Sequence, residues 1–153
     1  MIALGSDFVG YLLKKPIMEY LDANHIPYKD FGTFSTDNCD YPVYAYKAAK
    51  AVQSGECDLG ILFCGTGVGI SLAANKLDGI RCVVCSDPYS AAMARQHNNA
   101  NMLSLGQRVV GVELAKIIVK EFLNNEFLGG VHAKRVDMIS EIEQTQHLKA
   151  AEE

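Results

Sequence analysis

The sequence of 153 residues lacks the segments that direct a chain into or across a membrane. Its first seven residues contain neither the basic segment nor the long apolar segment of a signal peptide. No apolar run approaches the roughly 20 residues that span a bilayer. The formal net charge is only −4, so no strong positive field attracts nucleic acid or an anionic membrane. We therefore expect a cytoplasmic protein that binds neither nucleic acid nor a membrane.

The five cysteines are odd in number and do not suggest a framework of disulfides. A chain of this length buries about 70% of its unfolded surface, so its core needs neither disulfides nor a structural metal. Cys82 and Cys85 have the spacing of a redox motif, but they lie in a strand-like run, where positions three apart face opposite sides of a sheet. We expect no metal site, no cofactor and no redox centre.

Apolar runs of strand length alternate with longer segments of helical period, which is typical of a parallel sheet covered on both faces. We predict a three-layer, doubly wound, Rossmann-like α/β fold with a five-stranded parallel sheet. The expected strands are residues 2–5, 27–31, 59–64, 80–85 and 102–105. The expected helices are residues 12–24, a segment that carries Ala45 to Val52, residues 88–96 and residues 112–123.

Two of these helices leave details open. Pro16 should either kink the first helix or mark its first turn. In the helix over 112–123, we expect four apolar side chains on the buried face: Leu114, Ile117, Ile118 and Phe122.

The pattern changes after Gly129 and Gly130. Residues 133–143 combine regularly spaced apolar side chains with alternating charges, which suggests a final helix that docks on another surface, such as a second subunit. We expect residues 1–143 to form a single domain and residues 144–153 to form a frayed polar tail.

The most informative segment joins strand 59–64 to an amphipathic helix through Gly65, Gly67 and Gly69. Such a turn can present main-chain N–H groups to an anion. It matches neither the G-x-G-x-x-G dinucleotide motif nor a nucleotide-binding P-loop. Cys64 precedes the turn, where the helix N-terminus favours a thiolate that could act as a general base beside amides that stabilise an oxyanion. The alternative is a buried cysteine that only fills space.

Several polar residues could complete a site around Cys64. Asp7 follows the first strand and therefore lies on the same carboxyl edge of the sheet. His97 and Asn98 belong to a polar run that is costly to bury, and histidine transfers protons near neutral pH, although a lone histidine is often structural. We expect Cys64, His97 and Asp7 to meet at one sheet edge. Further candidates are Tyr41, which aims at a ligand or only follows a helix cap, and the anion-binding arginines Arg108 and Arg135.

These segments together resemble the family of ribose-5-phosphate isomerase B and the galactose-6-phosphate isomerase subunits. The resemblance runs in order from about residue 2 to residue 143, and the run Cys-Gly-Thr-Gly-Val-Gly over residues 64–69 is its most specific part. It implies an aldose–ketose isomerase that works on a sugar phosphate through an enediolate, without a metal. The expected reaction converts ribose 5-phosphate to ribulose 5-phosphate.

The resemblance also implies roles for individual residues. Cys64 would move the proton between C1 and C2, and the backbone of Gly65, Gly67 and Gly69 would stabilise the enediolate oxygen. His97, helped by Asp7 and Thr66, would open the sugar ring. The expected sugar and phosphate contacts come from Asn98, Tyr41, Arg108 and Arg135. Family members are homodimers, often paired into tetramers, whose active sites are shared by two subunits and reached by the C-terminal segment.

Two positions depart from the family pattern in its phosphate-binding set. Phe8 stands where ribose-type members carry a histidine, and Val131 stands where they carry an arginine. Three explanations follow: a rearranged phosphate site that uses His132 or Lys134, another sugar such as allose 6-phosphate or galactose 6-phosphate, or a chain completed by a partner subunit. A rival interpretation is a non-catalytic sugar-binding subunit.

Overall fold

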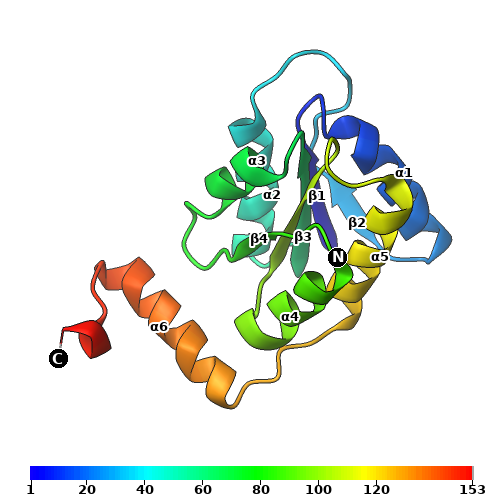
Figure 1. Cartoon of the computed structure of the whole chain (residues 1–153). Coiled ribbons are helices and arrows are strands. Elements are labelled where there is room, and N and C mark those ends of the chain that lie inside the picture. Colours follow the sequence, from blue (N-terminus) through cyan, green and yellow to red (C-terminus); the bar gives the residue numbers. More distant parts are fainter. Residues whose placement is uncertain (153) are drawn as a thin grey trace.

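The five expected strands form one parallel sheet in a computed structural model, which describes residues 1–152 (Figure 1). They are β1 (Ile2–Ser6), β2 (Tyr28–Asp30), β3 (Leu59–Cys64), β4 (Cys82–Val84) and β5 (Met102–Gly106). Their order in the sheet is β2-β1-β3-β5-β4, so β3 is central. The predicted doubly wound fold with a five-stranded parallel sheet is confirmed.

The helices match the predicted segments, including the helix expected after the glycine turn. They are α1 (Tyr11–Ala23), α2 (Tyr41–Gln53), α3 (Val68–Ala74), α4 (Pro88–Asn98), α5 (Val112–Asn124) and α6 (Val131–Thr145), followed by the 3-10 turn η1 (Lys149–Ala151). Pro16 lies inside α1, five residues after its start, so the first-turn interpretation of Pro16 is wrong. The helix lacks one main-chain donor at that point.

Both faces of the sheet are buried, which explains why β3 is apolar at nearly every position. Ile61 and Phe63 pack into the core layer beneath α1 and α5. Leu62 and Cys64 point the other way, into the layer formed with α2 and α3. The side chain of Cys64 therefore belongs to the α2–α3 side of the sheet.

The prediction for the buried face of α5 is half wrong. Its buried residues are Ala115, Ile118, Val119 and Phe122. Leu114 and Ile117 are 38% and 49% exposed. Both sets have helical spacing because the helix is apolar around most of its circumference, so packing against α1 and α4 decided which set is buried.

The helix α6 lies apart from the sheet, beyond an extended segment that follows α5 (Figure 1). It contacts α4, and Val136 is its buried residue. Near its other end, a side-chain oxygen of Glu143 accepts a hydrogen bond of 3.0 Å from the N–H of Gly79. Ile139 and Ile142 are nearly half exposed. None of the helices in residues 1–152 has the length and apolar character that a membrane crossing demands.

Candidate active site

The turn between β3 and α3 holds the thiol of Cys64 against main-chain amides. The Gly67 N–H donates to the Cys64 Sγ over 3.1 Å. Gly67 has a φ of +81°, which an L side chain adopts only with strain, and it forms the N-cap of α3. Cys64 is only 4% exposed in the single chain. Its sulfur thus lies at the carboxyl edge of the central strand, in the position where sheets of this type bind ligands.

A buried serine that the sequence interpretation missed supports this turn from below. The hydroxyl of Ser104, on β5, donates to the carbonyl oxygen of Gly67 over 2.6 Å and is fully buried. A Cβ on Gly106 would lie only 2.6 Å from the carbonyl carbon of Thr66, so β5 passes directly beneath the turn. The available signal was a single hydroxyl within the apolar run of residues 102–105.

Asp7 lies on the same edge as Cys64, as predicted. Its N–H donates to the Phe63 carbonyl over 3.2 Å, which places it beside the last residues of β3. Its carboxylate accepts a hydrogen bond of 2.8 Å from the Gly10 N–H and is almost fully buried. A Cβ on Gly10 would approach the Phe63 carbonyl oxygen to 2.1 Å, so α1 begins in tight contact with the end of β3.

Tyr41 and Arg108 flank the glycine turn. The Tyr41 ring lies over Gly69, since a Cβ there would be 2.8 Å from the ring carbon that bears the hydroxyl. The N–H of Arg108 donates to the Gly65 carbonyl over 3.0 Å, and its guanidinium extends past Gly65. Thr66 is exposed, and its hydroxyl accepts from the Val68 N–H over 3.2 Å. A phenol, a guanidinium and a hydroxyl therefore surround the amides beside the thiol.

His97 and Asn98 lie at the opposite edge of the sheet, so the prediction that His97 meets Cys64 and Asp7 at one edge is wrong within a single chain. These two residues end α4 just before β5 begins, and the start of β5 pairs with the start of β3. Figure 1 shows this end of α4 at the edge away from the β3–α3 turn. The pairing of Cys64 with Gly106 puts the two edges about 13 Å apart along β5. The physical reason is general, because a helix between parallel strands runs back to the amino edge.

His97 instead forms a second polar cluster with residues of α6. Its ring stacks on that of His132 with the ring centroids 4.2 Å apart and the planes 10° from parallel. Burial, together with the positive charges of His97 and Arg135, lowers the pKa of His132 below its ordinary value. Lys134 and Arg135 are exposed. The candidate residues thus fall into two groups, one around Cys64 and one around His97.

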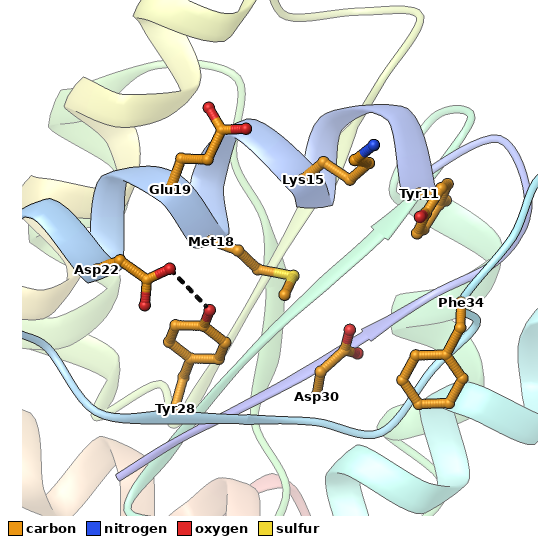
Figure 2. Close-up of a pocket in the computed structure, with 8 residues that line it drawn as sticks. All are labelled: Tyr11, Lys15, Met18, Glu19, Asp22, Tyr28, Asp30 and Phe34. Atoms are coloured by element: carbon orange, nitrogen blue, oxygen red, sulfur yellow. Dashed lines mark hydrogen bonds between the residues drawn. The ribbon is translucent and has the colours of Figure 1, made fainter.

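The groove in Figure 2 belongs to neither group. Its volume is about 290 Å³, and it lies between α1 and the edge strand β2. Beneath it, the fully buried Lys14 donates to Asp30 over 2.7 Å. Burial lowers the pKa of Lys14, while the ion pair with Asp30 opposes that change. None of the predicted site residues lines the groove.

Metal-binding geometry is absent from residues 1–152, where no three His, Cys, Asp or Glu side chains converge. All five cysteines are free thiols. Burial raises the pKa of Cys85 to about 11, and it raises that of Cys82 still further. Protonated, buried thiols are poor nucleophiles and poor ligands.

Comparison with known proteins identifies close relatives. Residues 2–139 match the family model described as Ribose/Galactose Isomerase. The chain is 53% identical to ribose-5-phosphate isomerase B of Escherichia coli over 95% of this chain and 98% of that protein. The structure of Clostridium thermocellum ribose-5-phosphate isomerase B is similar with a TM-score of 0.93 and 52% identity, covering 95% of this chain and 99% of that one. The Mycoplasma genitalium ribose-5-phosphate isomerase B, crystallised with bound ribulose-5-phosphate, has a TM-score of 0.89 and 41% identity over 94% of this chain and 96% of its own.

Proposed function

Because the chain belongs to the ribose/galactose isomerase family, we propose that it is a cofactor-independent aldose–ketose isomerase of sugar phosphates that interconverts ribose 5-phosphate and ribulose 5-phosphate. The observation that carries this proposal is the Cys64 thiol at the carboxyl edge of β3, in contact with the amide of the glycine turn. A base beside fixed N–H donors is what an enediolate mechanism requires.

In this proposal, the Cys64 thiolate removes the proton from C2 of the open-chain aldose. The electron pair of that C–H bond forms the C1–C2 double bond, and the carbonyl oxygen takes the negative charge. The N–H groups of Gly65, Gly67 and Gly69 stabilise this oxyanion. The Gly67 N–H, which donates to the Cys64 Sγ in the structure, turns to the oxyanion once the sulfur has taken up the proton. A proton then passes from the C2 hydroxyl to the C1 oxygen, and the thiol returns its proton to C1. The electron pair left on O2 forms the C2 carbonyl, which completes the ketose. Tyr41 contacts the sugar, and Arg108 neutralises part of the phosphate charge.

We propose that two chains share each site. Within one chain, the cluster of His97, Asn98, His132 and Arg135 is at the far edge of the sheet from Cys64. The outer face of α3 beside Cys64 exposes Val68 and Leu72, and α6 exposes Ile139 and Ile142. A second copy can cover these apolar side chains and bring its own His97 cluster to the first copy's glycine turn. His97, helped by Asp7 and Thr66, then opens the sugar ring, and the partner's Arg135 binds the phosphate. The minimal unit is a homodimer, and pairing of two homodimers would give a tetramer.

Exchange of the C2 proton tests the reaction directly. We expect incorporation of deuterium at C2 when the purified protein is incubated in deuterated water with ribose 5-phosphate, observed by NMR. The panel also includes allose 6-phosphate, galactose 6-phosphate and the free sugars, so that the preferred substrate emerges from the same experiment. Exchange with none of them would overturn the proposal.

A pair of cysteine variants tests the base. Cys64→Ala should lower kcat by about 10²–10⁴-fold, the usual contribution of a general base, while sugar binding measured by calorimetry persists. Cys82→Ala is the matched control, since it also removes a buried thiol from the sheet but should leave turnover unchanged. Turnover by Cys64→Ala close to that of the control would exclude the thiol as the base. If the protein were a non-catalytic sugar-binding subunit, both the wild type and Cys64→Ala would bind the sugar without turnover.

Mixing of inactive variants tests the shared site. In a dimer of one Cys64→Ala chain and one His97→Ala chain, one of the two sites keeps both native residues. Random mixing should therefore restore about a quarter of the wild-type activity, since half of the dimers are mixed. Activity that stays at the level of the separate variants, although mixed dimers form, would show that each chain carries a complete site.

A further inference from the structure

Two arginines, Arg81 and Arg95, lie close together at the end of α4, and both are partly buried. Neither forms a salt bridge within residues 1–152, although Glu143 and Glu126 favour their charges from a greater distance. Burial and the positive charge of Arg81 lower the pKa of Arg95, and the charge of Glu126 only partly opposes this change. Two neighbouring like charges withdrawn from water destabilise a fold unless other groups compensate for them.

Main-chain carbonyl groups provide that compensation. Arg81 Nε donates to the Asn99 carbonyl oxygen over 2.8 Å. Arg95 donates from Nη1 to the Ala100 carbonyl and from Nε to the Asn125 carbonyl, the latter over 3.3 Å. These acceptors lie just after the last turns of α4 and α5, where the helix dipoles place negative partial charge. The arginines therefore bind the ends of two helices.

The turn that Arg81 and Arg95 bind, at Asn99 and Ala100, directly follows His97 and Asn98. Asn99 has a φ of 47° and ends α4 in the left-handed region. The side chain of Asn101 accepts from the Arg81 N–H over 2.8 Å, so Arg81 holds the turn through both its main chain and its side chain. The position of the His97 imidazole thus depends on the contacts of residues 99–101, which follow it in the chain.

The same end of α4 is tied to the segment that leads to His132. Gln96 Nε2 donates to Asn125 Oδ1 over 2.5 Å, and the Gln96 carbonyl accepts from the Leu128 N–H over 3.0 Å. Arg95 joins this contact through the Asn125 carbonyl. The hydrogen bonds of Arg95, Gln96 and Asn125 therefore fix the end of α4, which carries His97, against the segment that leads to His132.

We propose that Arg81 and Arg95 are positioning residues for the opening of the sugar ring, because they fix the last turn of α4 and with it His97 and Asn98. This inference rests on the proposed function and extends it to residues outside the substrate contacts. Arginine suits this role, since one planar guanidinium can donate to two carbonyls at once, whereas lysine presents a single ammonium group.

Two substrates separate ring opening from proton transfer. Ribose 5-phosphate closes into a furanose and must be opened before C2 can lose its proton. Erythrose 4-phosphate cannot close such a ring, because its O4 carries the phosphate. It therefore needs the thiol of Cys64 but not the ring-opening step at His97.

The test compares Arg81→Lys, Arg95→Lys and the double variant with wild type and with His97→Ala. We expect kcat/KM for ribose 5-phosphate to fall about 10–100-fold in the double variant, and kcat/KM for erythrose 4-phosphate to change less than about threefold. His97→Ala should show the same selective loss. The deuterium isotope effect with ribose 5-phosphate labelled at C2 should also shrink toward unity, since ring opening becomes the slow step.

Equal losses on the two sugars with an unchanged isotope effect would overturn the inference, as would a folded, dimeric double variant with wild-type kinetics. If Arg95→Lys does not fold, the isotope effect and sugar selectivity of Arg81→Lys decide the question alone. Absence of ribose 5-phosphate turnover by the wild type would instead overturn the proposed function.

Discussion

Replacement of Gly67 by alanine tests the physical basis of the glycine turn in the candidate active site. Gly67 has a φ of +81°, and an added Cβ would lie 3.1 Å from the carbonyl carbon of Leu105 and 3.3 Å from the nitrogen of Gly106. These atoms belong to the backbone of β5 and cannot move aside easily. The left-handed conformation costs about 1–2 kcal/mol for an L residue, and overpacking costs about 1–3 kcal/mol more. The free energy of unfolding should fall by about 2–5 kcal/mol.

Any relaxation of the turn should also reduce catalysis. In the proposed mechanism the Cys64 sulfur acts as a thiolate, and a shift of the Gly67 N–H away from it removes a hydrogen bond of a kind that contributes about 1.5–3 kcal/mol. That loss corresponds to a decrease in kcat of about 10–100-fold. Urea unfolding measures the first effect. Steady-state kinetics and the rate of Cys64 alkylation by iodoacetamide measure the second.

Gly79→Ala is the matched control. Gly79 has a similar φ of +77°, but nothing lies within 4 Å of an added Cβ. It should therefore show the conformational cost alone, about 1–2 kcal/mol, with normal kinetics and normal alkylation of the thiol. If the two variants had the same stability and activity, the contacts of Gly67 with β5 and with the thiol would have no energetic importance.

Three further predictions concern the core and the phosphate site. Lys14→Met should destabilise the protein by about 3 kcal/mol in urea unfolding because it leaves Asp30 without its ion-pair partner. Lys15 is the exposed neighbour, and Lys15→Met should have little effect. An equal loss of unfolding free energy in the two variants would refute this prediction. Burial raises the pKa of Cys85 from 9.0 to about 11, so the neutral thiol stabilises the fold fully below pH 9. Between pH 9 and 11 the free energy of unfolding should fall by about 1 kcal/mol per pH unit. Cys85→Ala should make this fall shallower, and an unchanged slope of the free energy of unfolding against pH would contradict the prediction. Val131→Arg should lower KM for ribose 5-phosphate about 10–100-fold without changing that for free ribose, and an equal effect on both sugars would argue against a phosphate contact.

The sequence alone was sufficient for the fold class and for the positions of two candidate site residues. Alternating apolar runs identify strands and helices because burial on both faces of a sheet leaves a local pattern. Cys64 and Asp7 were correctly placed on one edge, since each directly follows or ends a parallel strand. That inference needs only the direction of the chain.

Other features depended on how the elements pack. The buried face of α5 and the position of the Tyr41 ring over Gly69 arise from contacts between segments that are far apart in the sequence. The contact of Ser104 with the Gly67 carbonyl has the same origin. Local periodicity does not distinguish among the possible contacts, because several apolar faces or polar groups satisfy the same spacing.

The location of His97 shows the difference most clearly. Its residue type and polar surroundings marked it as a candidate, but the direction of α4 takes it to the amino edge of the sheet, and the stack with His132 places it beside α6. The sequence determined which side chains are candidates for the proposed chemistry. The tertiary structure decided which of them lie within reach of one another, because distances between elements depend on the packing of the whole chain.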